Sequence, residues 1–537
     1  MTESKRPWVF AFDMIAKAED YPEFPVITFE NHPSTDEVLT YSDLVLKGNK
    51  LVKTIRKMGI GQGDAFCIVM RNHPEVVLAM YAASALGAVL VPIDPRSKGE
   101  KLRYQIKDSG SKGVIFSAEF IESIEEALAN LPEVKVIGCL YNPEFGVQVS
   151  SKHPDMQEIL EGPDAPMFEA DDYATDDRFM IMYTSGTTGN PKGVHRRGER
   201  LKFASMEAEL VWKYTPEDKL YTGLSLTHGN AQVVTLFPAL YNKIPAVISR
   251  KFTKTRIWDI CRTHGCTTFS LLGGMMRGIY SEPVKPNDED NPVRLVLSAG
   301  TPRYIWEAFE KRFNVKIHEW YGTMEGGFAH NPPGVGPTGS FGKPLEGRME
   351  MKVVREHDTE CETGEAGELI CRNLMGETRV EYHGNKEASE AKTRGGWLRT
   401  GDMCHRDEDG WFYFDCRKGG GLRRQGDFII PDYVEGIIAE HPEVLDVCVY
   451  GVEAASGAPG ESDLVAAIVP EKNDVVDIES IFDLCLSRLE RNSVPTYIQV
   501  VKEIPKSASE KNLDRPLRGK FNSEDENVYK LDNHISF

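Results

Sequence analysis

The most informative part of this 537-residue sequence reads Ile181-Met182-Tyr183-Thr184-Ser185-Gly186-Thr187-Thr188-Gly189-Asn190-Pro191-Lys192-Gly193. Its first residues are apolar and predict a buried strand, and most of the following residues are glycines or carry hydroxyl groups. Glycines let a backbone approach phosphate oxygens, and N–H groups, hydroxyls and the charge of Lys192 can bind them. The stretch therefore predicts a phosphate-binding loop rather than a flexible surface loop. It is not a P-loop, because Lys192 is followed by Gly193 and not by Ser or Thr.

Around this loop, short apolar runs alternate with helix-like stretches. Such alternation is typical of a parallel α/β sheet, which we predict for the N-terminal part of the chain. The stretch 340–414 is instead rich in β-forming and turn-forming residues. The predicted strands are residues 66–70, 88–91, 113–116, 134–139, 220–226, 246–249 and 295–298, and the predicted helices are residues 74–86 and 121–131.

The clearest domain boundary is Arg417-Lys418-Gly419-Gly420-Gly421. Three consecutive glycines cost backbone entropy and are expected where a chain must flex or turn sharply. We predict an α/β protein with a large N-terminal region of layered α/β subdomains (1–417), a hinge (418–421) and a small mobile α+β C-terminal domain (422–537). Within the C-terminal domain, the predicted helices are residues 433–439 and 478–489, and the predicted strands are residues 444–452 and 464–469.

Composition and charge limit the kinds of partner. The chain is 41% hydrophobic and 27% charged, as ordinary globular proteins are. Acidic residues outnumber basic ones by 82 to 63, and the net charge of −19 argues against nucleic acid or an anionic membrane as a partner. The ten cysteines form no CxxC pair, which favours reduced thiols and a cytoplasmic location. The sequence does not determine the oligomeric state, and a homodimer is one possibility.

The uncharged run 76–93 is long enough to suggest a membrane span. Residues 75–86, however, are rich in alanine and other helix-forming residues, and Gly87 can end a helix. Residues 88–91 then resemble a buried strand that Pro92 ends. We therefore predict a buried helix and a buried strand here, with no membrane span.

Together with later motifs, the stretch 181–193 resembles the signature of the adenylate-forming superfamily, which includes acyl-CoA and aryl-CoA synthetases, firefly luciferase and nonribosomal-peptide adenylation domains. The resemblance covers about residues 16–518 and implies the acyl-adenylate-forming fold. It implies an ATP-dependent acid–CoA ligase: a carboxylate and ATP give acyl-AMP and pyrophosphate, and coenzyme A then gives acyl-CoA and AMP. ATP, Mg²⁺ and coenzyme A are the implied cofactors. The later motifs, in the family's order, are Gly300-Thr301-Pro302, Trp320-Tyr321-Gly322-Thr323-Met324-Glu325, Gly367-Glu368-Leu369, Trp397-Leu398-Arg399-Thr400-Gly401-Asp402, Arg417 and Ser509-Glu510-Lys511.

The family's roles carry over to the matching positions. Attack of a carboxylate on the α-phosphate brings two anions together, so positive charge and a metal ion matter more than a general base. The resemblance implies that Tyr321 stacks on adenine, that Asp402 holds the ribose, and that Lys511 contacts the reacting groups. The residues implied to act in catalysis are Lys511, Glu325, Thr184 and His228, and the implied Mg²⁺ ligands are Glu325 and Thr188. The residues implied to bind the nucleotide are Ser185, Gly186, Thr187, Thr188, Gly189, Lys192, Gly300, Thr301, Pro302, Trp320, Tyr321, Gly322, Thr323, Asp402 and Arg417.

The residues that the resemblance places around the acyl group are mostly glycines. Each glycine leaves space that a side chain would fill, so we predict a wide pocket for a bulky, branched or cyclic acid, with Trp320 and Phe328 as flat walls. His228 matches the family's histidine beside this pocket, which gates the path of the thiol. The implied acid-binding residues are Gly229, Asn230, Gly273, Gly274, Ala299, Gly327 and Phe328.

Some positions depart from the family pattern. Met324 stands where the family has threonine, Gly419 where it has the hinge aspartate or lysine, and Asp427-Phe428 where it has Glu-Asn. The departures affect fine geometry and leave the charges of the adenylation step in place. Arginines near the implied thiol path are candidates for binding the phosphates of coenzyme A. These candidates are Arg96, Arg196, Arg197, Arg423 and Arg424.

Other functions share this scaffold. A nonribosomal adenylation domain usually carries an acidic residue where residues 226–229 read Leu-Thr-His-Gly. An adenylation-only enzyme and a luciferase-like oxidase stay open, and a non-catalytic acyl-AMP-binding protein is disfavoured by the presence of Lys511 and Glu325. Residues 421–424 and the Ala-Ser-Glu-Lys run that ends at Lys511 resemble the crotonobetaine/carnitine–CoA ligase group.

Overall fold

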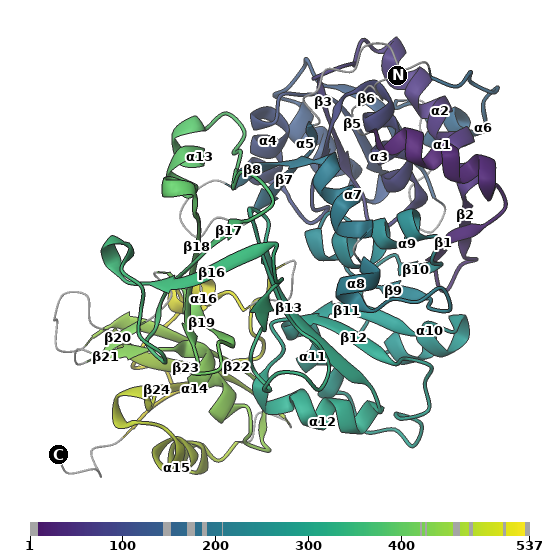
Figure 1. The fold of residues 1–537 in the computed structure, drawn as a ribbon. Coiled ribbons are helices and arrows are strands. Elements are labelled where there is room, and N and C mark those ends of the chain that lie inside the picture. The colour runs from purple at the N-terminus through teal and green to yellow at the C-terminus, as the bar shows by residue number, and fades with distance from the viewer. Residues whose placement is uncertain are drawn as a thin grey trace.

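The chain folds into a large N-terminal region and a smaller C-terminal domain, as the computed structural model shows (Figure 1). The N-terminal region runs from purple to green in Figure 1, and the C-terminal domain lies beside it in light green and yellow. This agrees with the predicted α/β fold class. The structure describes residues 9–142, 152–168, 178–184, 191–206, 208–418, 422–424, 427–454, 462–471, 476–507 and 512–531.

A first sheet carries the two strands that flank the predicted phosphate-binding loop. Its strands follow the order β6-β5-β3-β4-β7-β8, and neighbours are parallel except β8, which runs antiparallel to β7. Thr184 pairs with Lys192 across β7 and β8, so the two ends of the loop are adjacent. The bounds are β3 (Ala65–Val69), β4 (Val89–Pro92), β5 (Ser111–Ser117), β6 (Lys135–Leu140), β7 (Arg178–Thr184) and β8 (Lys192–Arg197).

A second sheet carries most of the remaining site. Its order is β15-β14-β13-β12-β11-β9-β10-β1-β2, and the strands from β13 to β1 are parallel. Ligands of parallel α/β sheets bind beyond the carboxyl ends of the strands, and Gly273 and Gly300 follow β11 and β12 there. The bounds are β1 (Pro25–Glu30), β2 (Glu37–Thr40), β9 (Leu220–Thr222), β10 (Ala246–Ser249), β11 (Thr268–Leu272), β12 (Leu295–Ala299), β13 (Lys316–Thr323), β14 (Gly326–Asn331) and β15 (Lys343–Pro344).

One predicted strand is shorter than expected. We predict a strand over 220–226, but β9 ends at Thr222. The buried side chain of Asn72 donates to the Leu224 carbonyl oxygen at 2.8 Å and accepts from the Leu226 N–H at 2.8 Å. These backbone groups are therefore bonded to a side chain and not to a neighbouring strand.

The helix α3 (Pro74–Leu86) is buried at every position. It belongs to a single apolar core that also takes in Phe66 of the first sheet and Ile27 of the second. Gly87 ends the helix in the left-handed conformation at φ 63°, and β4 follows, as predicted. Within the part of the chain that the structure describes, none of the helices combines the length and apolar character that a membrane crossing requires.

A third, antiparallel sheet accounts for the predicted β-rich stretch and follows the order β16-β17-β18-β19. It places Asp402 and Arg417 opposite each other on β18 and β19. The helix α13 (Lys386–Lys392) precedes β18. The bounds are β16 (Met349–Val354), β17 (Gly367–Asn373), β18 (Leu398–Arg406) and β19 (Phe412–Arg417).

The C-terminal domain has the predicted α+β character. Its sheet follows the order β22-β23-β24-β25, beside the hairpin β20-β21, and it has its own apolar core. The predicted hinge glycines 419–421 lie outside the described residues. The bounds are β20 (Leu422–Arg424), β21 (Asp427–Ile429), α14 (Pro431–Ile438), β22 (Val444–Glu453), β23 (Ser462–Pro470), α15 (Ile478–Arg488), β24 (Tyr497–Val500), α16 (Asp514–Arg518) and β25 (Val528–Lys530).

The remaining helices cover the faces of the N-terminal sheets (Figure 1). Their bounds are α1 (Phe10–Asp20), α2 (Tyr41–Lys57), α4 (Gly99–Asp108), α5 (Ile121–Leu128), α6 (Met156–Glu161), α7 (Gly198–Met206), α8 (Ala208–Trp212), α9 (Phe237–Asn242), α10 (Ile257–His264), α11 (Gly273–Tyr280) and α12 (Arg303–Phe313).

Candidate active site

A cleft of about 2930 Å³ lies between the sheets of the N-terminal region and the C-terminal domain. It brings together predicted residues that are far apart in the sequence. Ser185, Gly186, Thr187, Thr188, Gly189 and Lys511 lie outside the described residues. The predicted residues that line the cleft are Thr184, Lys192, His228, Gly229, Asn230, Gly273, Gly274, Ala299, Gly300, Thr301, Pro302, Trp320, Tyr321, Gly322, Thr323, Glu325, Gly327, Phe328, Asp402 and Arg417.

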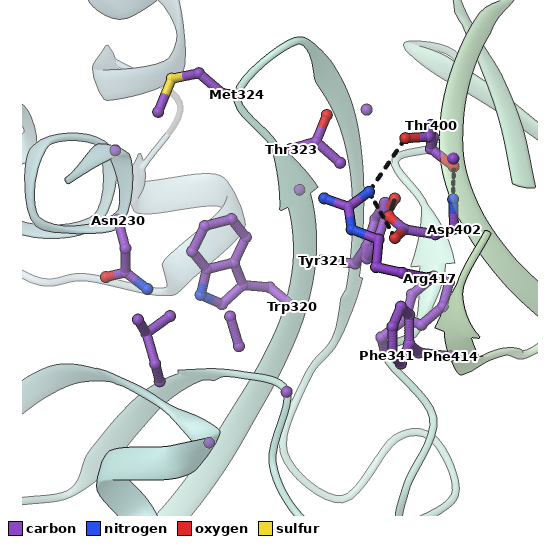
Figure 2. A pocket seen from close by; sticks show the side chains of 18 of the residues that line it. Asn230, Trp320, Tyr321, Thr323, Met324, Phe341, Thr400, Asp402, Phe414 and Arg417 are labelled. Carbon is purple, nitrogen blue, oxygen red and sulfur yellow. Dashed lines mark hydrogen bonds and ion pairs between the residues drawn. The ribbon is translucent and has the colours of Figure 1, made fainter. Parts of the chain in front are cut away.

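One end of the cleft is organised around Asp402, which is 3% exposed (Figure 2). Its carboxylate accepts a hydrogen bond from the Tyr321 hydroxyl at 2.5 Å and pairs with Arg417 Nη1 at 2.8 Å. The Thr400 hydroxyl oxygen accepts a hydrogen bond from the Asp402 N–H at 3.0 Å. The Tyr321 ring stacks on Phe341 at 4.6 Å between centroids. These contacts fix the positions of the carboxylate and the aromatic ring that the resemblance assigns to ribose and adenine.

The turn at Gly300 is held by a residue that the sequence patterns do not single out. The buried carboxylate of Glu319 accepts from the Gly300 N–H at 2.6 Å and from the Thr301 N–H at 3.2 Å. Burial raises the pKa of Glu319 to about 8. Glu319 directly precedes the motif that begins at Trp320, and this position in β13 is a signal that could have identified it. Gly300 itself adopts φ 81°, which favours glycine.

The end of the cleft where the resemblance implies the phosphates is lined by Glu325, Lys192 and a further residue, Tyr382. The Tyr382 hydroxyl donates to Glu325 Oε1 at 2.8 Å, and Lys192 Nζ lies 5.1 Å from the centre of the Tyr382 ring. The Tyr382 side chain is 6% exposed, so its orientation is fixed by packing. Lys392 also lines this end and donates to the Thr400 carbonyl at 3.2 Å. Burial is the largest influence on its pKa and lowers it, against the opposing charge of Glu325.

The opposite end of the cleft is lined by aromatic rings. Trp212 contacts Trp320 and Phe328 edge to face, each at 5.5 Å between centroids. The buried Asn230 faces Trp320 across the cavity in Figure 2. Trp212, at the end of α8, is a wall residue that the sequence does not identify. Flat apolar rings beside few polar groups form a surface for an apolar, ring-bearing group.

The glycines of the predicted acid pocket do not all leave open space. A Cβ atom on Gly273 would lie 1.7 Å from the Gly300 carbonyl oxygen, so this glycine permits two backbone segments to meet. On Gly327, which has φ 81°, it would lie 3.0 Å from Cys371 Sγ, and on Gly229 it would lie 3.1 Å from Met324 Cε. The predicted reason for a wide pocket is therefore wrong at Gly273, and at Gly327 and Gly229 a neighbouring side chain would have to shift.

Met324 stands where the family has threonine, and the structure shows where its side chain and that of its neighbour Thr323 lie. The Met324 side chain points toward the acyl end, away from Asp402 (Figure 2). The Thr323 hydroxyl donates to the Gly326 carbonyl at 2.8 Å and accepts from the Gly326 N–H at 3.2 Å. The Thr323 hydroxyl is thus engaged in its own turn.

Four of the five candidate arginines for coenzyme A have protein partners. Arg424 donates to the backbone carbonyls of Asn492 and Val494, which supports the C-terminal domain. The Arg423 side chain is outside the described part of the structure. Arg196 donates to the Met324 carbonyl at 2.9 Å, Arg197 pairs with Glu381 at 3.0 Å, and Arg96, which lines the cleft and is 52% exposed, pairs with Asp94 at 3.2 Å.

Two family models match the chain. The model described as AMP-binding enzyme matches residues 15–375, and the AMP-binding enzyme C-terminal domain matches residues 433–511. The crotonobetaine/carnitine–CoA ligase of Salmonella paratyphi A is 26% identical over 514 residues, which cover 93% of this chain and 97% of that protein. The ligase of the same name from Citrobacter koseri is 25% identical with the same coverage.

Solved structures show the same fold. An anthranilate CoA ligase solved with anthranoyl-AMP has a TM-score of 0.83 at 21% identity, with 97% of this chain and 98% of that chain covered. A benzoate CoA ligase from Burkholderia xenovorans has a TM-score of 0.83 at 22% identity, with 95% and 100% covered. An o-succinylbenzoate CoA synthetase from Bacillus subtilis, solved with ATP and magnesium, has a TM-score of 0.78 at 24% identity, with 95% and 98% covered.

Proposed function

Because the chain belongs to the family of AMP-binding enzymes, we propose that it is an AMP-forming acid–CoA ligase. It joins a carboxylate to the α-phosphate of ATP, releases pyrophosphate, and transfers the acyl group to coenzyme A with release of AMP. One observation carries the proposal: a single cleft joins a nucleotide end built on Asp402 to an aromatic end built on Trp212 and Trp320.

The nucleotide end fits ATP and Mg²⁺. Asp402 and Arg417 would hold the ribose, Tyr321 and the turn at Gly300 would hold adenine, and Lys192 would meet the phosphates. In the described part of the chain, no group of three His, Cys, Asp or Glu side chains is placed to hold a metal ion. Mg²⁺ commonly uses one or two carboxylates together with substrate phosphates, and Glu325, which accepts a hydrogen bond from Tyr382, would be such a carboxylate. When bound, Mg²⁺ offsets negative charge on the phosphates.

The C-terminal domain (422–537) supplies Lys511 to the adenylation step in this proposal. It then turns about residues 418–421, relative to residues 1–417, so that the thiol of coenzyme A can enter. In support, Lys506, Ser507 and Asn512, which flank Lys511 in sequence, line the same cleft as Thr184. His228 lines the acyl end, where it would gate the thiol path.

The acid is proposed to be bulky and to carry a ring or branch. The support for this class of acid is the aromatic wall of Trp212, Trp320 and Phe328. The glycines are not used as support, because Gly273 lies at a close contact between two backbone segments. A small acid such as acetate would leave this wall uncovered and gain little from it.

The cytoplasm is the proposed location, because all ten cysteines, each in a described segment, are buried thiols. A homodimer is the proposed assembly to test first by light scattering.

The test measures acid-dependent pyrophosphate release with Mg²⁺ and ATP, and compares kcat/KM for acetate, octanoate and benzoate. We expect AMP to accumulate, benzoate or octanoate to exceed acetate by about tenfold or more, and acyl-CoA to form when coenzyme A is added. Formation of ADP and phosphate would refute adenylation. Release of AMP without acyl-CoA would favour an adenylation-only enzyme, and a preference for acetate would refute the bulky acid.

A further inference from the structure

Arg277 joins the two domains across the cleft. It lies on α11 of the N-terminal region, and its Nη1 donates to Asp446 Oδ1 of the C-terminal domain at 2.9 Å. The same Nη1 lies 3.4 Å from the Val447 carbonyl oxygen, and Nη2 lies 4.0 Å from Glu435 Oε2 on α14. The guanidinium also lies over the ring of Tyr304 on α12, 6.0 Å from its centre. One cation of the N-terminal region thus contacts two elements of the C-terminal domain.

This contact is shielded from water. The side chains of Arg277, Asp446 and Glu435 are 20%, 15% and 11% exposed. A charge pair in such surroundings is weakly screened, and removal of one partner leaves the other charge buried without compensation. Separation of the two domains would break this pair and replace it with contacts to water, and Asp446 would keep its pair with Lys506. The pair therefore favours the domain arrangement in which it is made.

The same acidic residue also holds a segment of the C-terminal domain. Lys506 Nζ pairs with the second carboxylate oxygen of Asp446 at 2.6 Å and donates to Asn512 Oδ1 at 3.2 Å. Asn512 Nδ2 donates to the Val447 carbonyl at 2.9 Å. Residues 506 and 512 are thus both anchored to the start of β22, where Arg277 also binds. Both line the cleft, as Arg277 does.

We propose that Arg277 is a positioning residue for the adenylation half-reaction: by pairing with Asp446 it holds the C-terminal domain so that residues 506 and 512 face the phosphate end of the cleft. The inference rests on the proposed function, in which Lys511 acts between these residues. Turning of the C-terminal domain must break the Arg277–Asp446 pair. Arg277 therefore supports acyl-AMP formation and is dispensable for thioester formation.

The deciding experiment measures the domain arrangement without relying on activity. Spin labels on Leu46→Cys and Leu486→Cys, which are 53% and 37% exposed in the two domains, report the interdomain distance by pulsed electron resonance with and without Mg·ATP. The native cysteines are buried and accept no label. We expect a single main distance in the parent, a broadened and shifted distribution in Arg277→Ala, and recovery of most of the parent distribution in Arg277→Lys, which keeps the charge.

The second readout separates the half-reactions. For the best acid among acetate, octanoate and benzoate, Arg277→Ala should lower pyrophosphate release by about tenfold or more. Thioester formation from the corresponding synthetic acyl-AMP should change by less than about threefold. Lys506→Ala, which leaves the Arg277–Asp446 pair intact, should lower pyrophosphate release without changing the distance distribution.

A matched control is Arg256→Ala, which removes the partly buried Arg256–Glu30 pair (2.7 Å) inside the N-terminal region. It should lower the melting temperature without altering the interdomain distance. An unchanged distance in Arg277→Ala overturns the proposal, and so does an equal loss in both half-reactions. If none of the three acids releases pyrophosphate, the proposed function fails, and the distance measurement still decides whether Arg277 sets the domain arrangement.

Discussion

Different kinds of interaction stabilise the two ends of the cleft. At the nucleotide end, Asp402 is bound directly by Tyr321 and Arg417, so the positions of individual polar atoms are set. At the acyl end, Trp212 and Trp320 contact each other through ring edges and faces, which sets a shape and leaves few fixed polar atoms. The nucleotide end can therefore be matched to a particular ligand, whereas the acyl end defines only a class of acids.

The largest effect is expected from Asp402→Ala. The substitution removes the partner of Tyr321 and leaves Arg417 without its carboxylate, so kcat/KM for ATP should fall by about 100-fold. Initial rates of pyrophosphate release at varied ATP measure it. The exposed Glu408→Ala in the turn after β18 is the matched control and should change the rate by less than about twofold. A rise confined to the KM of the acid would contradict the assignment of the two ends.

Tyr382→Phe should have a smaller effect at the same end. It keeps the ring beside Lys192 but removes the hydroxyl that donates to Glu325. Because Glu325 is the proposed Mg²⁺ ligand, we expect about a tenfold loss of kcat and a higher Mg²⁺ concentration for half-maximal rate. A Mg²⁺ titration of the rate provides the measurement. Loss of activity with an unchanged Mg²⁺ requirement would count against the role of Tyr382.

Phe328→Ala tests the acyl end. Removal of a ring that Trp212 contacts should lower kcat/KM for benzoate by about tenfold. The KM for ATP should change by less than about twofold, because Phe328 lies outside the Asp402 contacts. Steady-state kinetics with each substrate varied in turn measure both values. If the two KM values rise together, the ends of the cleft are not independent.

The smallest effect concerns Glu319 and pH. Burial raises its pKa to about 8 from an ordinary 4.5, so the folded protein keeps a proton that the unfolded chain releases between these values. The stabilisation is complete below about pH 4.5 and is lost as the pH rises through about 8. Glu319→Gln stays neutral, so its Tm relative to the parent should rise by about 2 °C or more from pH 5 to pH 8.5. A constant difference across that range would show that Glu319 is ionised when folded.

Much of the fold can be predicted from local patterns. Helix α3 and strand β10 match their predicted bounds, because Gly87 and a run of apolar residues mark them within the sequence. The predicted extent of β9 is wrong, since its end depends on Asn72, about 150 residues earlier in the chain. Such a long-range side-chain contact leaves no pattern around residue 222.

The same limit applies to the site. Tyr321, Asp402 and Arg417 lie in recognisable motifs, and the structure brings them into direct contact. Tyr382 and Trp212 are single aromatic residues in segments without a motif, so only the folded chain shows their contacts with Glu325 and Trp320. Sequence motifs rich in charged residues and glycines indicate a nucleotide-binding site. The shape of an apolar wall depends on residues that only the folded chain brings together.

The parallel pairing of β1 with β10 has a consequence for biosynthesis. The strand β1 (Pro25–Glu30) leaves the ribosome before its partner β10 (Ala246–Ser249) by roughly 200 residues, about 10–40 s at 5–20 residues per second. During this interval the second sheet is incomplete, and α3, which is buried along its whole length in the folded protein, lacks part of the core that covers it. A nascent chain of this length exposes the surface that chaperones bind, and ribosome-bound chains shorter than about 250 residues are expected to recruit them more strongly than longer ones.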